Sequence, residues 1–85
     1  MNAHKVGNYC GFNSGVVIGN KGKDVCPVIG DYVAFGPGSK AFGNVRIEDN
    51  CFVAPNAVVT KDMPANSIIA GIPAKRIKEK EQRKL

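Results

Sequence analysis

Residues 29–64 divide into six successive hexapeptides that read IGDYVA, FGPGSK, AFGNVR, IEDNCF, VAPNAV and VTKDMP. Every one of them begins with an apolar residue. The same spacing extends toward the N-terminus through Val6, Phe12 and Ile18, with one interruption before Ile29. A period of six fits neither the period of about 3.6 residues of an α-helix nor the alternation of a simple strand. Repeats of this length predict a β-helix.

Two further positions of the repeat agree with the first. Three residues after each apolar position, most residues are Gly, Asn or Asp, which tolerate the positive φ that the third residue of a type II turn requires. These residues are Tyr9, Gly15, Tyr32, Gly38, Asn44, Asn50, Asn56 and Asp62. The next residue in each repeat is small or apolar and can fill the space beside the turn. This second set is Cys10, Val16, Val33, Ser39, Val45, Cys51, Ala57 and Met63.

The predicted fold is all-β, a parallel β-helix in which three hexapeptides close one triangular coil. Residues 6–23, 29–46 and 47–64 would form about three such coils. Parallel pairing between coils would satisfy the backbone N–H and C=O groups. Apolar residues at equivalent positions of successive coils should stack in the core. The expected pairs are Ile29 with Ile47, Phe35 with Val53, and Ala41 with Val59.

The C-terminal segment is basic. The 85-residue chain has a net charge of +5, and residues 75–85 contain six basic and two acidic side chains. We expect a short basic helix or tail, with the β-helix domain over residues 1–77 and the tail over residues 78–85. The segment has no aromatic side chain on which a base could stack, so nucleic acid is not an expected partner.

Composition argues against several other classes of protein. No apolar run approaches the roughly 18 residues of a membrane span, and the N-terminus lacks the layout of a signal peptide. We therefore expect a cytoplasmic protein without a membrane partner. Cys10, Cys26 and Cys51 form no CxxC pair, which predicts neither a disulfide framework nor a metal site.

The interruption between Ile18 and Ile29 spans 11 residues where the repeat needs six. Five residues should therefore extend from the coil as a loop. Long loops on a regular scaffold often carry function.

Several motifs resemble the C-terminal part of bacterial serine acetyltransferases and related sugar O-acetyltransferases. They are the hexapeptide period, Pro27-Val28-Ile29-Gly30 after a Gly-rich excursion, Val59-Thr60-Lys61-Asp62-Met63-Pro64, and Ala70-Gly71-Ile72-Pro73-Ala74-Lys75. The resemblance covers about residues 5–78. It implies a left-handed β-helix that forms a homotrimer, with acetyl-CoA in the groove between two subunits and no metal. The implied reaction transfers an acetyl group to a hydroxyl of a small acceptor such as serine or a sugar.

The resemblance also implies which residues contact CoA. The pantetheine arm would pass the small residues of two stacked turns, Thr60 and Lys61 would lie near the far end of the cofactor, and Lys75 and Lys78 would meet its phosphates. The turn residues are Gly36, Pro37, Gly38, Ala54 and Pro55. The family usually has Ala or Ser where this chain has Pro37 and Pro55, and proline removes a backbone N–H.

Acetyl transfer needs a general base, normally a histidine. His4 is the only histidine of the chain and is the candidate base, although by alignment of the repeats the catalytic histidine of the family and its carboxylate partner fall upstream of Met1. We therefore expect the chain to be the C-terminal part of a longer enzyme. In the family, the loop carries a histidine just before its proline, near the acceptor. Here the substrate loop has Asp24 and, at that position, Cys26.

Two alternatives from other classes share the fold. One is a non-catalytic trimeric scaffold, or the tail domain of a sugar nucleotidyltransferase. The other is a zinc carbonic anhydrase, which needs three histidine ligands per site and fits poorly with one histidine in 85 residues.

Overall fold

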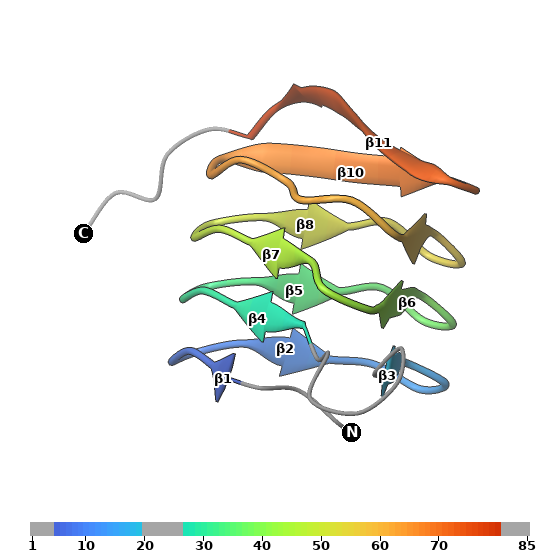
Figure 1. The fold of residues 1–85 in the computed structure, drawn as a ribbon, viewed down its shortest axis with the longest axis horizontal. Coiled ribbons are helices and arrows are strands. Elements are labelled where there is room, and N and C mark those ends of the chain that lie inside the picture. The colour runs from blue at the N-terminus through green and yellow to red at the C-terminus, as the bar shows by residue number, and fades with distance from the viewer. Residues whose placement is uncertain (1–4, 20–26, 81–85) are drawn as a thin grey trace.

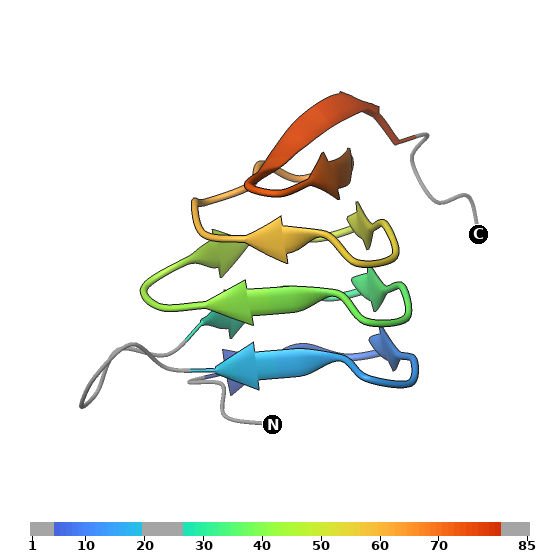
Figure 2. The same cartoon turned by 90° about the vertical axis from the view of Figure 1, so that its right-hand side faces the viewer.

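The computed structural model describes residues 5–19 and 27–80. In this part of the chain, short strands stack into a parallel β-helix with three faces (Figures 1 and 2). The first face contains β1 (Lys5–Val6), β4 (Val28–Ile29) and β7 (Arg46–Ile47). The second face contains β2 (Gly11–Phe12), β5 (Ala34–Phe35), β8 (Phe52–Val53), β10 (Ser67–Gly71) and β11 (Ala74–Glu79). The third face contains β3 (Val17–Gly19), β6 (Lys40–Phe42) and β9 (Val58–Val59). No helix among these residues is long and apolar enough to cross a membrane.

The pairing register confirms the predicted stacking. The Cα partners include Ile29 with Ile47, Phe35 with Val53, and Ala41 with Val59. All six side chains are buried. The position beside each turn also points into the core, because Val33, Cys51 and Ala57 are buried as well. Each hexapeptide therefore contributes two inward side chains.

The repeat is regular only between the second and third coils. Partners there are 18 residues apart, as in Lys40 with Val58. Between the first and second coils they are 23 apart, as in Val17 with Lys40, which confirms the five extra residues of the predicted loop. Above the third coil the spacing falls to 16, where Ile47 bridges to Met63 and Val53 pairs with Ile69.

Most of the predicted turn residues have positive φ. The prediction is confirmed for Tyr9, Gly15, Tyr32, Gly38, Asn50 and Asn56. It is wrong for Asn44 and Asp62, which lie where β6 and β9 end and only three residues make the corner. Gly43 takes the positive φ there, and the Asp62 carboxylate instead accepts a hydrogen bond from the Arg46 N–H at 2.8 Å.

The two tyrosines are the exceptions among these turn residues, since bulky side chains rarely adopt positive φ. Tyr9 and Tyr32 have φ of 59° and 57°, and their rings stack with centroids 5.1 Å apart. Stacked aromatic rings attract by an amount that offsets part of the backbone strain.

The basic C-terminal segment does not form the expected helix or free tail over its described residues. Residues 74–79 form β11, which pairs antiparallel with β10 and covers the last parallel strand of the second face (Figure 1). This pairing satisfies backbone groups that an uncovered edge would leave exposed. Residues 78 and 79, assigned to the tail by the sequence, therefore belong to the folded domain.

A β-bulge in this hairpin sets the direction of its charged side chains. Ile69 pairs with Arg76 and Ile68 with Lys78, so Ile77 is the extra residue. Cross-strand partners point to the same face of a sheet. Lys78 therefore points outward with Ile68, whereas Arg76 lies on the same side of the hairpin as Ile69 and stays partly exposed.

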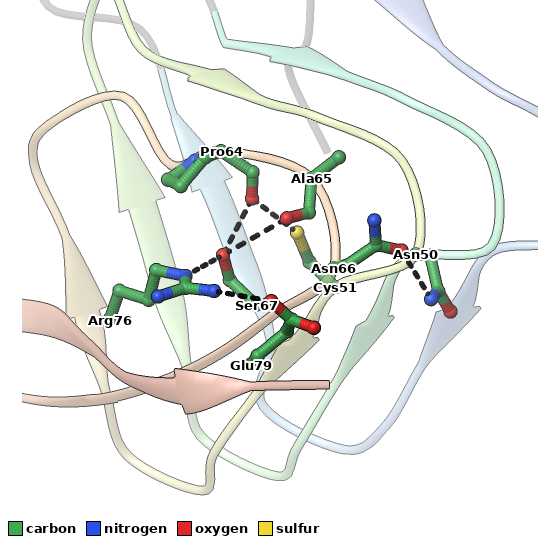
Figure 3. A network of polar contacts seen from close by, with 8 residues as sticks. All are labelled: Asn50, Cys51, Pro64, Ala65, Asn66, Ser67, Arg76 and Glu79. Carbon is green, nitrogen blue, oxygen red and sulfur yellow. Dashed lines mark hydrogen bonds and ion pairs between the residues drawn. The ribbon is translucent and has the colours of Figure 1, made fainter. Parts of the chain in front are cut away.

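Arg76 closes the end of the coil through a small polar network (Figure 3). Its Nε donates to Ser67 Oγ at 2.9 Å, and its guanidinium lies 3.8 Å from the Glu79 carboxylate. The Ser67 hydroxyl donates in turn to the Pro64 carbonyl at 2.7 Å. The same carbonyl accepts a contact from Cys51 Sγ at 3.2 Å, which ties the hairpin to the buried core.

Replacing Ile47 by Ala should lower the free energy of unfolding by about 2–4 kcal/mol, because the cavity would open between Ile29 and Met63 in a fully buried column. Ile47→Val should cost about 1 kcal/mol, since one methylene is lost. Urea unfolding followed by circular dichroism measures both. Equal small losses for the two variants would contradict the stacking.

Burial raises the pKa of the Cys51 thiol above its ordinary value of 9.0, which means that unfolding favours the thiolate. The contribution of this thiol to stability is therefore full below pH 9.0 and should fall as the pH rises above that value. In a Cys10→Ser/Cys26→Ser background, alkylation of Cys51 should be slow in the native state and should accelerate on unfolding.

The control is Cys51→Val in the same background, because Val33 already occupies the equivalent position of the coil below. Its unfolding free energy should lack the alkaline decline that Cys51 contributes. If Cys51 reacts in the native state as fast as a free thiol, the burial is wrong.

Candidate functional site

The candidate site is built on two stacked turns that join the second face to the third, at residues 36–39 and 54–57. We call these turns the proline corner. Each is closed by a hydrogen bond across the turn, from Ser39 N to Gly36 O at 3.2 Å and from Ala57 N to Ala54 O at 3.2 Å. The third residue of each turn, Gly38 or Asn56, has φ of 73° or 62°, as a type II turn requires.

Glycine is needed at Gly36 because the two turns pack closely. A Cβ there would lie 2.6 Å from Pro55 N, so any side chain would push the turns apart. Pro37 and Pro55 are exposed, and Ala54 and Gly38 are partly exposed. The proline corner therefore presents a narrow ridge of small groups, along which an extended ligand such as a pantetheine arm could lie without meeting a long side chain from these positions.

Lys75 lies at the C-terminal end of this ridge. It pairs with Ala70 on β10, and the preceding residue, Ile69, accepts a hydrogen bond from Ala54 N at 2.8 Å. Lys78 pairs with Ile68 and also points outward, one step further from the ridge. Both lysines are exposed. The structure thus brings Lys75 to the stacked turns and places Lys78 beside it on the same face.

Thr60 and Lys61 lie elsewhere in the fold. They follow β9, at the corner that joins the third face to the first, and both are exposed. The third face therefore separates them from the proline corner within one chain. The residues implied to contact CoA form two groups, one along each edge of the third face.

Lys40 is a residue near the site that the sequence did not single out. It lies on β6 in the third face, between Val17 and Val58 in the register. Its side chain is half-buried, and its Nζ donates to the Gly38 carbonyl of the proline corner at 2.9 Å. No sequence pattern distinguishes Lys40 from an ordinary outward strand residue. Its contact with Gly38 is visible only in the structure.

The remaining predicted site residues, His4, Asp24 and Cys26, lie outside the described residues. Within residues 5–19 and 27–80, no group of three His, Cys, Asp or Glu side chains could hold a metal ion.

Two aspartates near the first face accept hydrogen bonds from the backbone. A shallow hollow of about 210 Å³ lies there, lined in part by Gly30, Asp31, Glu48 and Asp49. The Asp49 carboxylate accepts from Asp31 N at 2.7 Å, and the Asp31 carboxylate accepts from Asn8 N at 2.8 Å. Each aspartate thus caps the turn of the coil below, in space that a Cβ on Gly30 or Gly7 would fill.

The sequence and the fold match known proteins. Residues 26–61 match the bacterial transferase hexapeptide family (six repeats). A serine acetyltransferase from Synechococcus elongatus is 35% identical over 75 residues, which are 85% of this chain and 31% of that protein. The crystal structure of the Neisseria gonorrhoeae serine acetyltransferase has a TM-score of 0.86 at 32% identity, over 93% of this chain and 32% of that one.

A third similar protein is the serine acetyltransferase from Brucella abortus strain S19, whose crystal structure is a complex with coenzyme A. It has a TM-score of 0.80 at 35% identity, over 85% of this chain and 30% of that chain. The chain thus spans about a third of the length of these relatives. We therefore identify the chain as a hexapeptide-repeat protein that is related, along most of its length, to part of the serine acetyltransferases.

Proposed function

We propose that the chain forms part of an acetyl-CoA-dependent O-acetyltransferase and supplies much of its CoA-binding surface. The observation that carries this proposal is the likeness to a serine acetyltransferase in complex with coenzyme A, at 35% identity over 85% of the chain. The exposed ridge of small residues at the proline corner, with Lys75 at its end, has a shape and charge that suit the cofactor. The acceptor would be a small hydroxyl compound, either serine or a sugar.

Each group of residues then has a role. The pantetheine arm lies along Gly36, Pro37, Gly38, Ala54 and Pro55, and Lys75 and Lys78 neutralise the phosphates as point charges. The exposed Thr60 and Lys61 sit at the other edge of the third face. A left-handed β-helix assembled as a homotrimer would allow this edge of one subunit to face the ridge of its neighbour, so that the two groups contact one cofactor.

The chemistry is acyl transfer from a thioester. A general base takes the proton of the acceptor hydroxyl, whose oxygen then forms a bond to the acetyl carbon while the carbon–sulfur bond breaks. The protonated base then gives its proton to the departing sulfur, so that CoA leaves as a thiol. His4 is the candidate base within the chain. Asp24 and Cys26 belong to the loop that would lie near the acceptor. This reaction needs no metal.

A non-catalytic trimeric scaffold is the second candidate, because Pro37 and Pro55 both lack the backbone N–H that an Ala or Ser at those positions would offer a ligand. The two candidates differ in one property. An enzyme of this type must bind CoA, whereas a scaffold need only trimerise.

We expect calorimetric titration of CoA into the full chain to show saturable binding near one CoA per subunit, with the mass in solution corresponding to a trimer. Lys75→Ala should weaken CoA binding about fivefold, as expected for the loss of one partly exposed charge-assisted contact. Lys80→Ala is the matched control. It removes the same charge just beyond the other end of β11, where the ammonium donates to Asn50 Oδ1 at 2.7 Å, and should leave the affinity unchanged.

The outcomes separate the two functions. An intact trimer that does not bind CoA would support the scaffold and overturn the enzyme proposal. CoA binding that Lys75→Ala and Lys80→Ala weaken equally would retain the function and remove the specific role of Lys75.

A further inference from the structure

We propose that Lys40 is a positioning residue of the CoA groove, whose ammonium donates a hydrogen bond to a carbonyl oxygen of the pantetheine arm. This role rests on the proposed function. It follows from the hydrogen-bond donors at the proline corner, because no backbone N–H of these two turns is available to a ligand.

Every backbone N–H of the two turns is either bonded within the protein or absent. In the first turn, Gly36 N donates to Val53 O at 2.7 Å, Gly38 N to Ser14 O at 2.9 Å and Ser39 N to Gly36 O at 3.2 Å. Pro37, at the apex, has no N–H.

The second turn repeats this arrangement. Ala54 N donates to Ile69 O at 2.8 Å, Asn56 N to Pro37 O at 3.0 Å and Ala57 N to Ala54 O at 3.2 Å. Pro55 occupies the apex and again has no N–H. The ridge therefore lacks the backbone donor that a non-proline residue at either apex would supply.

A pantetheine arm needs such donors. It carries two amide carbonyls, and the acetyl thioester adds a third carbonyl. Moving a carbonyl out of water costs free energy when no protein donor replaces its hydrogen bonds to water. A pantetheine arm without such a donor would therefore bind weakly along this ridge.

Lys40 is placed to supply the donor. Lys40 is the first residue of β6, directly after the first turn, and its side chain lies on the outer side of the strand. Its Nζ is held 2.9 Å from Gly38 O. An ammonium has three protons, of which this contact uses one. Among the outward residues of β3, β6 and β9, which are Val17, Gly19, Lys40, Phe42 and Val58, Lys40 alone carries a charge.

The anchoring contact matters for this role. A lysine without such a contact would sample many rotamers and would lose much conformational entropy on binding a ligand. Lys40 is half-buried between Val17 and Val58, and its ammonium is already fixed beside the ridge. A hydrogen bond from a pre-positioned ammonium to a neutral carbonyl is also stronger than one between neutral groups.

Lys40→Met tests the proposal, because methionine keeps an aliphatic stem and removes the ammonium. In calorimetry on the full chain, the variant should bind CoA about tenfold more weakly than the wild type. The loss should be the same for 3′-dephospho-CoA and at low or high ionic strength, since the partner is an uncharged carbonyl. The melting temperature should stay close to that of the wild type.

A rescue makes the test specific. Pro55→Ala returns one backbone N–H to the apex of the second turn, so Lys40→Met/Pro55→Ala should bind CoA at least about threefold more tightly than Lys40→Met. Lys80→Met is the matched control. It removes an ammonium that is also anchored on a protein oxygen, Asn50 Oδ1 at 2.7 Å, but away from the ridge, and it should leave the affinity unchanged.

Each failure has a distinct meaning. If the wild type does not bind CoA, the proposed function fails. If the wild type binds and Lys40→Met binds equally well, or if Lys80→Met weakens binding as much as Lys40→Met does, the role of Lys40 is wrong. A loss that shrinks with 3′-dephospho-CoA or at high ionic strength would assign Lys40 to a phosphate and overturn the pantetheine contact.

Discussion

The hydrogen bond from each coil to the one above it is the constraint on which the rest of the structure depends. Gly36 N bonds to Val53 O at 2.7 Å, and Ala54 N bonds to Ile69 O at 2.8 Å. Because these bonds fix parallel strands in register, every residue lies above its equivalent in the coil below. The same register aligns the apolar core, the turns and the small residues of the proline corner. The exposed ridge of small residues is thus a direct consequence of the fold.

Much of the fold was predictable because, between the second and third coils, the sequence repeat and the pairing of the strands share the same spacing. The pairs Ile29 with Ile47 and Phe35 with Val53 follow from a spacing of 18 residues alone. Prediction of the turns failed at the corners that follow β6 and β9, where only three residues make the corner. Asp62 was assigned a turn conformation, but the corner after β9 is too short for it, and the next positive φ in the chain falls at Asn66. Nothing in the local sequence marks that change of spacing.

The C-terminal segment and the site show a different limit. The basic segment that forms β11 has no regular alternation of apolar and polar residues. The pairing of β11 with β10 and the bulge at Ile77 could therefore not be predicted from the sequence. For the site, the resemblance supplied the positions at the proline corner, and the register shows that they stack. It did not reveal that Thr60 and Lys61 lie across the third face from them, because that separation depends on how the triangular coil closes.

Proline at the apex of both turns has two opposing effects on a ligand site. It fixes φ near the value that the second residue of a type II turn needs, which makes the ridge stiffer and reduces the entropy lost on folding. It also removes the backbone N–H at the apex, while the other N–H groups of each turn are bonded within the protein. A cation fixed on the strand that follows the turn can restore that donor without loosening the ridge, and Lys40 occupies this place, with its ammonium 2.9 Å from the carbonyl of Gly38. The stiff turn and the anchored lysine are therefore two complementary parts of the ligand-binding surface that we propose.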